Sequence, residues 1–185
     1  MLAEITIKIV VVSISLFILD YRIAIVTLVL LTMPLYVPKL VEKKLQSAQT
    51  EFVKQFENHI KAITDWLSGF EIIKNFSIEK NIEEKFIESN INTMEKNLEK
   101  RQIGYLTRSI SALLSYFSHF IILVFAAYLV LKGDFSAGDF FIAVGMIDQL
   151  SYPIISLSYF IQDLVSVKPV NMSILEFINQ EPTKH

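Results

Sequence analysis

The feature that most constrains this chain is an apolar run over residues 109–131, in which only His119 is readily ionisable. An α-helix rises about 1.5 Å per residue and the hydrocarbon core of a bilayer is about 30 Å thick, so about 20 apolar residues cross it. The run is therefore long enough for a transmembrane helix. The whole chain of 185 residues is 52% hydrophobic, which is too apolar for an ordinary soluble domain of this size.

Three further apolar stretches predict three further spans. Residues 23–38 follow a polar turn at Asp20, and residues 140–162 follow a second short turn. Residues 2–19 reach spanning length only if Lys8 is included, so the chain is expected to begin inside a transmembrane helix. A signal peptide is rejected for this stretch because no small-residue cleavage site follows it. We expect an all-α membrane protein with four transmembrane helices.

Residues 39–108 differ in character, because they hold twelve of the 17 Lys and Arg residues and no proline. Apolar residues recur there at roughly helical spacing, which predicts two long antiparallel helices joined near residues 75–80. Basic residues favour the cytoplasmic side of a membrane. We therefore expect a cytoplasmic helical hairpin below the plasma membrane.

The stretch 65–86 forms the predicted tip of this hairpin. It contains a possible helix end at residues 65–69, followed by an apolar cluster of Ile72, Ile73, Phe76 and Ile78. An apolar tip on a charged stalk suggests a docking element. The alternative is a hairpin corner that packs only on itself, and the residues alone do not decide between the two.

Two residue types predict local irregularities. Pro34 is expected to kink its span, because proline lacks an N–H and its ring clashes with the preceding turn. Gly133 and Gly138 lie in the short turn before residue 140 and are expected to supply unusual backbone angles.

Several motifs occur in a fixed order along the chain. They are Asp20, then Pro34-Leu35, then Asp65-x-Leu67-x-Gly69-Phe70-x-x-Ile73-Lys74-x-Phe76-x-x-Glu79, then Gly133-x-x-Ser136-x-Gly138-Asp139-Phe140, and finally Leu150-x-x-Pro153-Ile154-x-x-Leu157. With these motifs the chain resembles the transmembrane domain of type I, six-helix ATP-binding-cassette (ABC) exporters. The resemblance runs from the third to the sixth membrane helix of that family. It implies a partial transmembrane domain over residues 1–180 and a tail over residues 181–185.

The resemblance also implies a role for the tip. In such exporters the corresponding loop carries a coupling helix that docks in a groove of a nucleotide-binding domain belonging to the opposite half-transporter. The positions that carry over are Asn75, Phe76, Ser77, Ile78, Glu79, Lys80 and Asn81. The implied partners are the lipid bilayer, a nucleotide-binding domain that holds ATP and Mg²⁺, and a second half-transporter in a homo- or heterodimer.

The chain departs from the family pattern in two ways. The first two membrane helices and the nucleotide-binding domain have no counterpart in it, and it contains no GxxxxGK[ST] phosphate loop. We therefore expect a fragment or one piece of a split gene, with no cofactor of its own. Pro169 falls where the family usually continues an unbroken helix.

Polar residues inside the apolar spans suggest a substrate pathway. Lys8, His119 and Asp148 lie about 14–20 Å from the nearest predicted turn, near mid-membrane, where charged groups usually face water or a partner. The pathway-lining candidates are Asp148, Tyr152, Ser156, Tyr159, Ser115 and His119. The alternative for these side chains is hydrogen bonding between packed helices, and a proton relay through His119 and Asp148 is a further option.

Other functional classes are excluded or disfavoured. A net charge of −2 suggests no nucleic-acid partner, and the lack of cysteine excludes disulfides and thiolate metal sites. The three histidines are scattered, so neither a metal site nor a catalytic constellation is predicted, and an enzymatic role is left open. A membrane signalling or scaffold protein is the main alternative, but short outer loops favour transport; a truncated remnant without function is the other. The substrate is not indicated.

Overall fold

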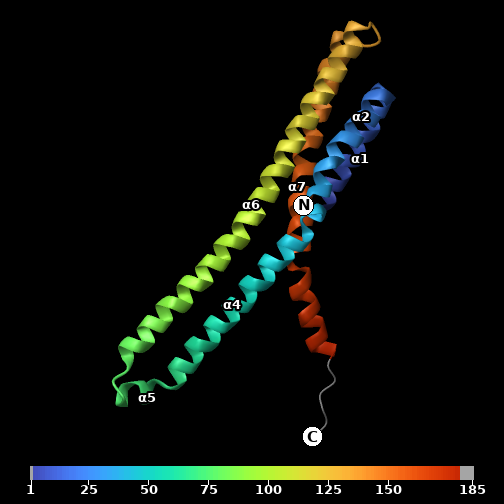
Figure 1. The fold of residues 1–185 in the computed structure, drawn as a ribbon. Helices are drawn as coiled ribbons and strands as arrows, with labels where there is room; N and C mark the ends of the chain where they lie inside the picture. Colours follow the sequence, from blue (N-terminus) through green and yellow to red (C-terminus); the bar gives the residue numbers. More distant parts are fainter. Residues whose placement is uncertain (1, 180–185) are drawn as a thin grey trace. The chain divides into compact units, whose positions relative to one another are not determined.

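In the computed structural model, which describes residues 2–179, every regular element is a helix (Figure 1). The elements are α1 (Leu2–Leu19), α2 (Tyr21–Thr32), the 3₁₀ helix η1 (Met33–Tyr36), α3 (Val37–Leu40), α4 (Glu42–Ser68), α5 (Phe70–Asn75), α6 (Glu79–Leu131) and α7 (Ala137–Asn179). The predicted all-α class is confirmed. The predicted tail, residues 181–185, lies outside the described residues.

Three segments within the described residues are long and apolar enough to cross a membrane: Tyr21–Leu40, Glu79–Leu131 and Ala137–Met172. They include the predicted spans 23–38, 109–131 and 140–162. Helix α1 is not among the three, so the fourth predicted span, residues 2–19, stays a prediction.

The chain divides into two compact units. Residues 2–41 and 106–164 form one, called here the bundle unit, and residues 42–105 and 165–179 form the other, the hairpin unit. This division was not foreseen, and the domain bounds 1–180 remain a prediction.

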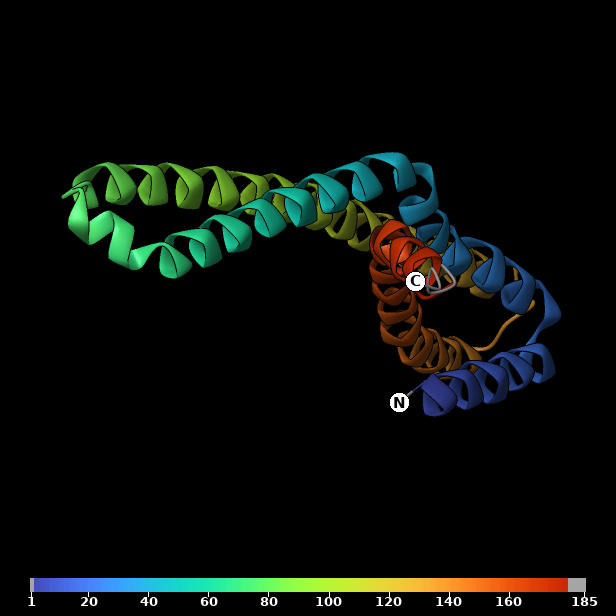
Figure 2. The same cartoon turned by 90° about the horizontal axis from the view of Figure 1, so that it is seen from below.

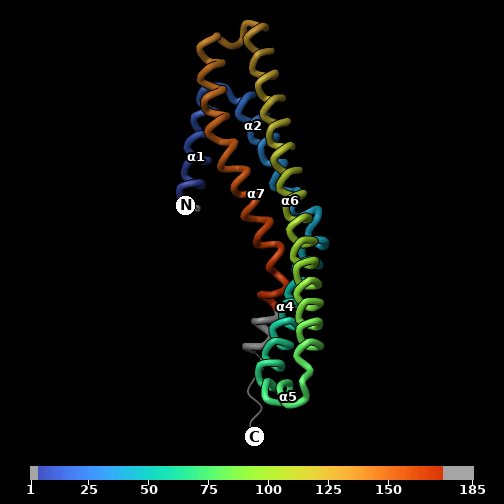
Figure 3. The backbone as a smooth tube through the Cα atoms, turned by 90° about the vertical axis from the view of Figure 1, so that its left-hand side faces the viewer, coloured from blue at the N-terminus to red at the C-terminus, as the bar shows by residue number. Residues whose placement is uncertain are grey.

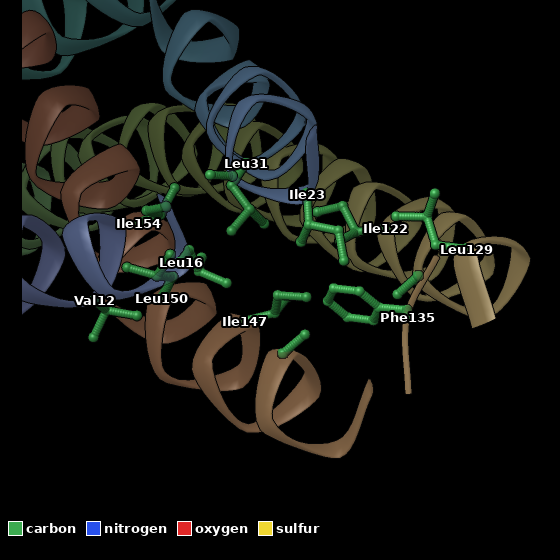
Figure 4. Close-up of a cluster of buried hydrophobic side chains, with 13 residues drawn as sticks. Val12, Leu16, Ile23, Leu31, Ile122, Leu129, Phe135, Ile147, Leu150 and Ile154 are labelled. Atoms are coloured by element: carbon green, nitrogen blue, oxygen red, sulfur yellow. The ribbon is translucent and has the colours of Figure 1, made fainter. Parts of the chain in front are cut away.

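The bundle unit is built around one buried apolar cluster (Figure 4). Val12 and Leu16 come from α1, Ile122 comes from α6, and Ile147 and Leu150 come from α7. All five side chains are buried, and four of them have no exposed surface, because each lies on the helix face that the neighbouring helices cover. The opposite faces carry many exposed large apolar side chains, which suits contact with lipid.

The break between α2 and α3 follows from two prolines four residues apart. Pro38 has no N–H, so it cannot bond the carbonyl of Pro34 in the α-helical manner. The chain tightens instead into η1, where that carbonyl accepts the N–H of Val37. It also accepts the hydroxyl of Ser158 on α7 at 3.0 Å. The predicted irregularity at Pro34 is thus a 3₁₀ segment fastened to a neighbouring helix.

The turn between α1 and α2 is held by Asp20. Its carboxylate caps α2 by accepting the N–H groups of Arg22 at 2.7 Å and Ile23 at 3.4 Å. The Arg22 guanidinium bonds Asp20 at 2.9 Å and also Asp134, in the turn after α6, at 2.7 Å. The hydrogen bonds from Arg22 hold the pKa of both carboxyls below the usual range. This arginine therefore joins the two turns of the bundle unit.

The backbone geometry of the turn between α6 and α7 explains why a glycine occupies position 133. Gly133 has a φ of 83°, and the N–H groups of Gly133 and Asp134 bond the carbonyls of Val130 and Leu129. These are the bonds of a Schellman C-cap, whose left-handed position favours glycine. The expectation for Gly133 is confirmed. Gly138 instead lies in the first turn of α7 without a positive φ, so the expectation for it was wrong.

Helix α7 begins with a reciprocal cap. The Ser136 hydroxyl lies 3.1 Å from the N–H of Asp139, and the Asp139 carboxylate accepts the N–H of Ser136 at 3.0 Å. This capping box satisfies two backbone donors that a helix start leaves open. From this turn α6 and α7 run antiparallel as neighbours within the bundle unit (Figure 3).

Helix α7 continues to Asn179, through Pro153 and Pro169, whereas the sequence predicted a membrane span ending near residue 162. The prediction placed the end of the span just before Asp163, where charged residues begin. A charge ends an apolar span but does not end a helix, because charged residues are good helix formers in water.

In the hairpin unit, α4 and the first part of α6 run antiparallel and side by side (Figure 2). His59 Nδ1 lies 2.8 Å from the Ser89 hydroxyl, and Lys96 bonds Glu51 at 2.9 Å. The hydrogen bond from Lys96 lowers the pKa of Glu51. The two-helix hairpin predicted over residues 39–108 is present, although the helices begin at residues 42 and 79.

We predict that Gly133→Ala destabilises the bundle unit by roughly 1–2 kcal/mol, because a Cβ disfavours left-handed backbone angles. The matched control is Gly138→Ala, where the added Cβ meets only the Ser136 hydroxyl at an ordinary 3.6 Å. Thermal unfolding in detergent, followed by circular dichroism, should show a loss for the first variant only. Equal effects would contradict the Schellman assignment.

We also predict that Ser158→Ala costs about 0.6–1.7 kcal/mol, the range found for hydrogen bonds between membrane helices. The same unfolding measurement checks it. Ser109→Ala is the control, because Ser109 is exposed on α6. If both variants unfold alike, the bond to the Pro34 carbonyl contributes nothing measurable.

Candidate functional site

The hairpin tip consists of one short helix and a tight turn. Helix α4 ends at Ser68, and Gly69 separates it from α5, as the predicted helix end at residues 65–69 requires. After α5 the N–H of Ser77 bonds the Lys74 carbonyl and the N–H of Ile78 bonds the Ile73 carbonyl. This is again a Schellman cap, with Ser77 in the left-handed position at a φ of 50°.

The apolar residues of the tip are exposed. Phe76 is 73% exposed and Ile72 is 61% exposed, and no residue of α5 is buried. A corner that packs only on itself would bury these side chains. Their exposure leaves an apolar surface at the end of the hairpin unit, which typically marks an interaction site.

The residues carried over from the exporter resemblance fall on three local structures. Asn75 ends α5, Phe76 and Ser77 form the turn, and Glu79 starts α6, with Lys80 and Asn81 in its first turn. The predicted docking segment is therefore a turn flanked by the end of α5 and the start of α6, and the short helix at the tip lies just before that turn. Lys74 bonds Glu79 at 2.9 Å, and this hydrogen bond lowers the pKa of Glu79.

A second candidate region lies on the apolar part of α6 and α7. His119 Nε2 lies 3.3 Å from Asp148 Oδ1, and His119 Nδ1 lies 3.2 Å from the Ser151 hydroxyl. The sequence singled out the first two residues but missed Ser151. Its position three residues after Asp148, on the same helix face, was the available signal.

The other pathway candidates divide by exposure. Tyr152 is exposed, Ser156 and Tyr159 are half-buried, and all three follow Asp148 at helical spacing on α7. Ser115 is buried on α6, between Ser111 and Ser118, which are buried as well. A buried stripe of small residues suits close helix packing, so the placement of Ser115 fits the helix-contact alternative.

A third polar contact was missed by the sequence reasoning. Arg108 on α6 bonds Asp163 on α7 at 2.7 Å, and its guanidinium lies over the ring of Tyr159 at 5.3 Å. No short-range spacing connects residues 55 positions apart, so only the fold could reveal this pair. It fastens the two helices near the end of their apolar segments.

Within the residues that the structure describes, no group of three or more His, Asp or Glu side chains could hold a metal ion. His59 is buried in the hairpin unit, where it lies against the ring of Phe86 at 5.6 Å as well as Ser89. Its role is to pack the two helices together.

The family model described as the ABC transporter transmembrane region matches residues 1–154. The match covers most of the chain and includes the tip, the turn after α6 and the pair of His119 and Asp148. No curated protein matches the chain.

Proposed function

Because this chain belongs to the family of ABC transporter transmembrane regions, we propose that it serves an ATP-driven exporter, with the hairpin tip docking on a partner ATPase. The chain is an integral membrane protein and the transmembrane part of a transporter. The observation that supports docking on a partner ATPase is the exposed apolar tip centred on Phe76.

The energetics of the tip support docking. Burying a side chain such as Phe76 in a partner groove stabilises an interface by about 1.5–3 kcal/mol. The cap at Ser77 fixes the direction in which the turn leaves α5, so little order has to be gained on binding. The ion pair of Lys74 with Glu79 closes the base of the same turn.

ATP and Mg²⁺ would be held by the partner nucleotide-binding domain, since the 185 residues contain no phosphate loop. In this arrangement the partner domain supplies the free energy of ATP hydrolysis. The hairpin transmits its movement, and the membrane helices carry the substrate.

Asp148, Tyr152, Ser156 and Tyr159 would line the substrate path. They form one polar stripe on α7 that the helices of this chain leave open or half-open, and His119 contacts it from α6. Lipid is a poor neighbour for a carboxylate. A second half-transporter would place this stripe against a shared, hydrated path.

The cytoplasmic position of the hairpin can be tested by labelling, because the chain has no cysteine of its own. We predict that a membrane-impermeant maleimide labels Ser136→Cys from outside intact cells. Ser77→Cys should be labelled only after the cells are permeabilised. Labelling of both variants from the same side would contradict the proposed topology and the plasma-membrane orientation.

We predict that Phe76→Ala uncouples the assembled transporter. Losing about 1.5–3 kcal/mol of burial weakens docking roughly 10–150-fold, so transport should fall while ATP turnover by the partner persists. The measurement is transported substrate per ATP hydrolysed, after reconstitution with the first two membrane helices of the family pattern and a candidate ATPase.

Phe56→Ala is the matched control, because Phe56 is also an exposed phenylalanine but lies along α4, away from the tip. It should leave coupling unchanged. Cross-linking from Ser77→Cys to the ATPase groove provides a second readout. Unchanged coupling in Phe76→Ala together with no cross-link would show that the tip is only a hairpin corner.

A further inference from the structure

We propose that one face of α6 in the hairpin unit is a docking surface for a basic amphipathic helix of a partner protein. The face consists of an apolar stripe with an acidic edge beside it. This surface includes neither the tip nor the membrane segments, so its role is separate from the proposed transport function. The α6 stripe is defined by four side chains: Ile87, Ile91, Met94 and Leu98. The acidic edge is defined by three: Glu84, Glu88 and Glu95.

The α6 stripe lies on the opposite side of the helix from α4. Helix α6 meets α4 through Ser89, which lies 2.8 Å from His59 Nδ1, and through Lys96, which bonds Glu51 at 2.9 Å. Successive residues of an α-helix are rotated by about 100°, so every side chain of the stripe lies at least about 140° around α6 from Ser89 and from Lys96. The stripe side chains are 48–57% exposed. The described part of the hairpin unit therefore leaves this apolar surface uncovered.

The spacing of the stripe is that of a contact between two helices. Its residues follow one another at intervals of four, three and four, and this alternation keeps apolar side chains against a second helix over several turns. From Glu84 to Leu98 the surface is about 21 Å long, at about 1.5 Å per residue. A partner helix of about four turns would cover it.

A groove at one end of the stripe is both polar and apolar. It has a volume of about 300 Å³ and is lined by Glu84, Ile87, Glu88, Ile91 and Asn92. All five residues come from α6, so a second element is needed to close the groove. Two carboxylates beside two isoleucines suit a lysine or arginine, because its apolar stem can pack on the isoleucines while its charged end meets the carboxylates.

The charges between residues 84 and 98 of α6 are separated by side. Lys96 lies on the α4 side, where it bonds Glu51, and Lys85 lies within about 40° of Ser89 around the helix. No glutamate of the acidic edge forms an ion pair with any residue that the structure describes. The side away from α4 is therefore acidic over this stretch, and a basic partner would complement it.

The same charges disfavour two other occupants of the stripe. In an antiparallel pair of two copies of this chain, the acidic edge would lie against itself, and like charges repel. The surface of a membrane that contains anionic lipids would also repel the acidic edge. A helix with apolar residues on one face and lysine or arginine along one border is the occupant that both the stripe and the edge favour.

The test uses the full chain in nanodiscs of zwitterionic lipid, which do not attract basic peptides by charge. The probe is a fluorescent peptide of about 18 residues, long enough to form a helix, with leucine at the spacing of the stripe and lysine along one border. Two control peptides carry glutamate in place of lysine, or the same composition in scrambled order. Fluorescence anisotropy against empty nanodiscs measures binding. We expect only the basic helix to bind, and more weakly as salt screens the charges.

Two variants test the two parts of the surface. Ile91→Ala should weaken binding about tenfold, because about half of the lost side chain is exposed before docking and buried after it. Glu88→Lys should weaken binding about fivefold or more at low salt, because attraction becomes repulsion.

The matched controls lie on α4. Ile60 is 46% exposed, against 49% for Ile91, and Glu57 is an exposed glutamate like Glu88. Ile60→Ala and Glu57→Lys should therefore bind the peptide as the wild type does. Circular dichroism should show unchanged helix content in all four variants, since the substituted side chains are exposed and lysine and alanine are good helix formers.

No binding of the basic peptide, equal binding of the acidic peptide, or equal losses in the variants of α4 and α6 would each overturn the proposal. A lack of peptide binding together with pairing of two chains that Ile91→Ala abolishes would assign the stripe to a second copy instead. Peptide binding requires neither the tip nor an ATPase. Phe76→Ala should leave it unchanged, so failure of the tip proposal and failure of this one can be told apart.

Discussion

A lipid interior offers no hydrogen-bond partners, and this constraint explains most of the local structure in the bundle unit. At several places where the helical pattern fails, a specific group supplies a bond. Ser158 does so for the carbonyl that Pro38 leaves open. Asp20, Gly133 and Ser136 do so at helix ends. Apolar burial then determines which helix faces meet.

The sequence predicted the features that depend on neighbouring residues. Long apolar runs located the membrane segments, Asp20 located the turn before α2, and Gly133 located the turn after α6, because span length, capping and left-handed geometry are short-range properties. The prediction failed where a residue type that is common in turns lies within a helix. Gly138 was expected to supply an unusual backbone angle, yet it lies in the first turn of α7 without a positive φ.

Features that join distant positions could not be predicted. Helical spacing shows that Ser115 and Tyr152 each lie on a polar stripe, but it does not show which stripe faces the neighbouring helix. The structure buries the first and exposes the second. The bonds of Arg108 to Asp163 and of Ser158 to Pro34 likewise depend on how helices are placed, for which no spacing rule exists. The hairpin tip was located correctly, but its central residues form a turn because Ser77 adopts a left-handed backbone angle.

The bond between Ser158 and the Pro34 carbonyl limits how the helices that it joins can move. It connects η1 to α7 at a single point. A shift of α7 along its own axis by one turn, about 5.4 Å, would break this bond. A rotation of the two segments about the bond would keep it. The contact therefore acts as a pivot, so that relative movement of these segments is directed into tilting and not into sliding.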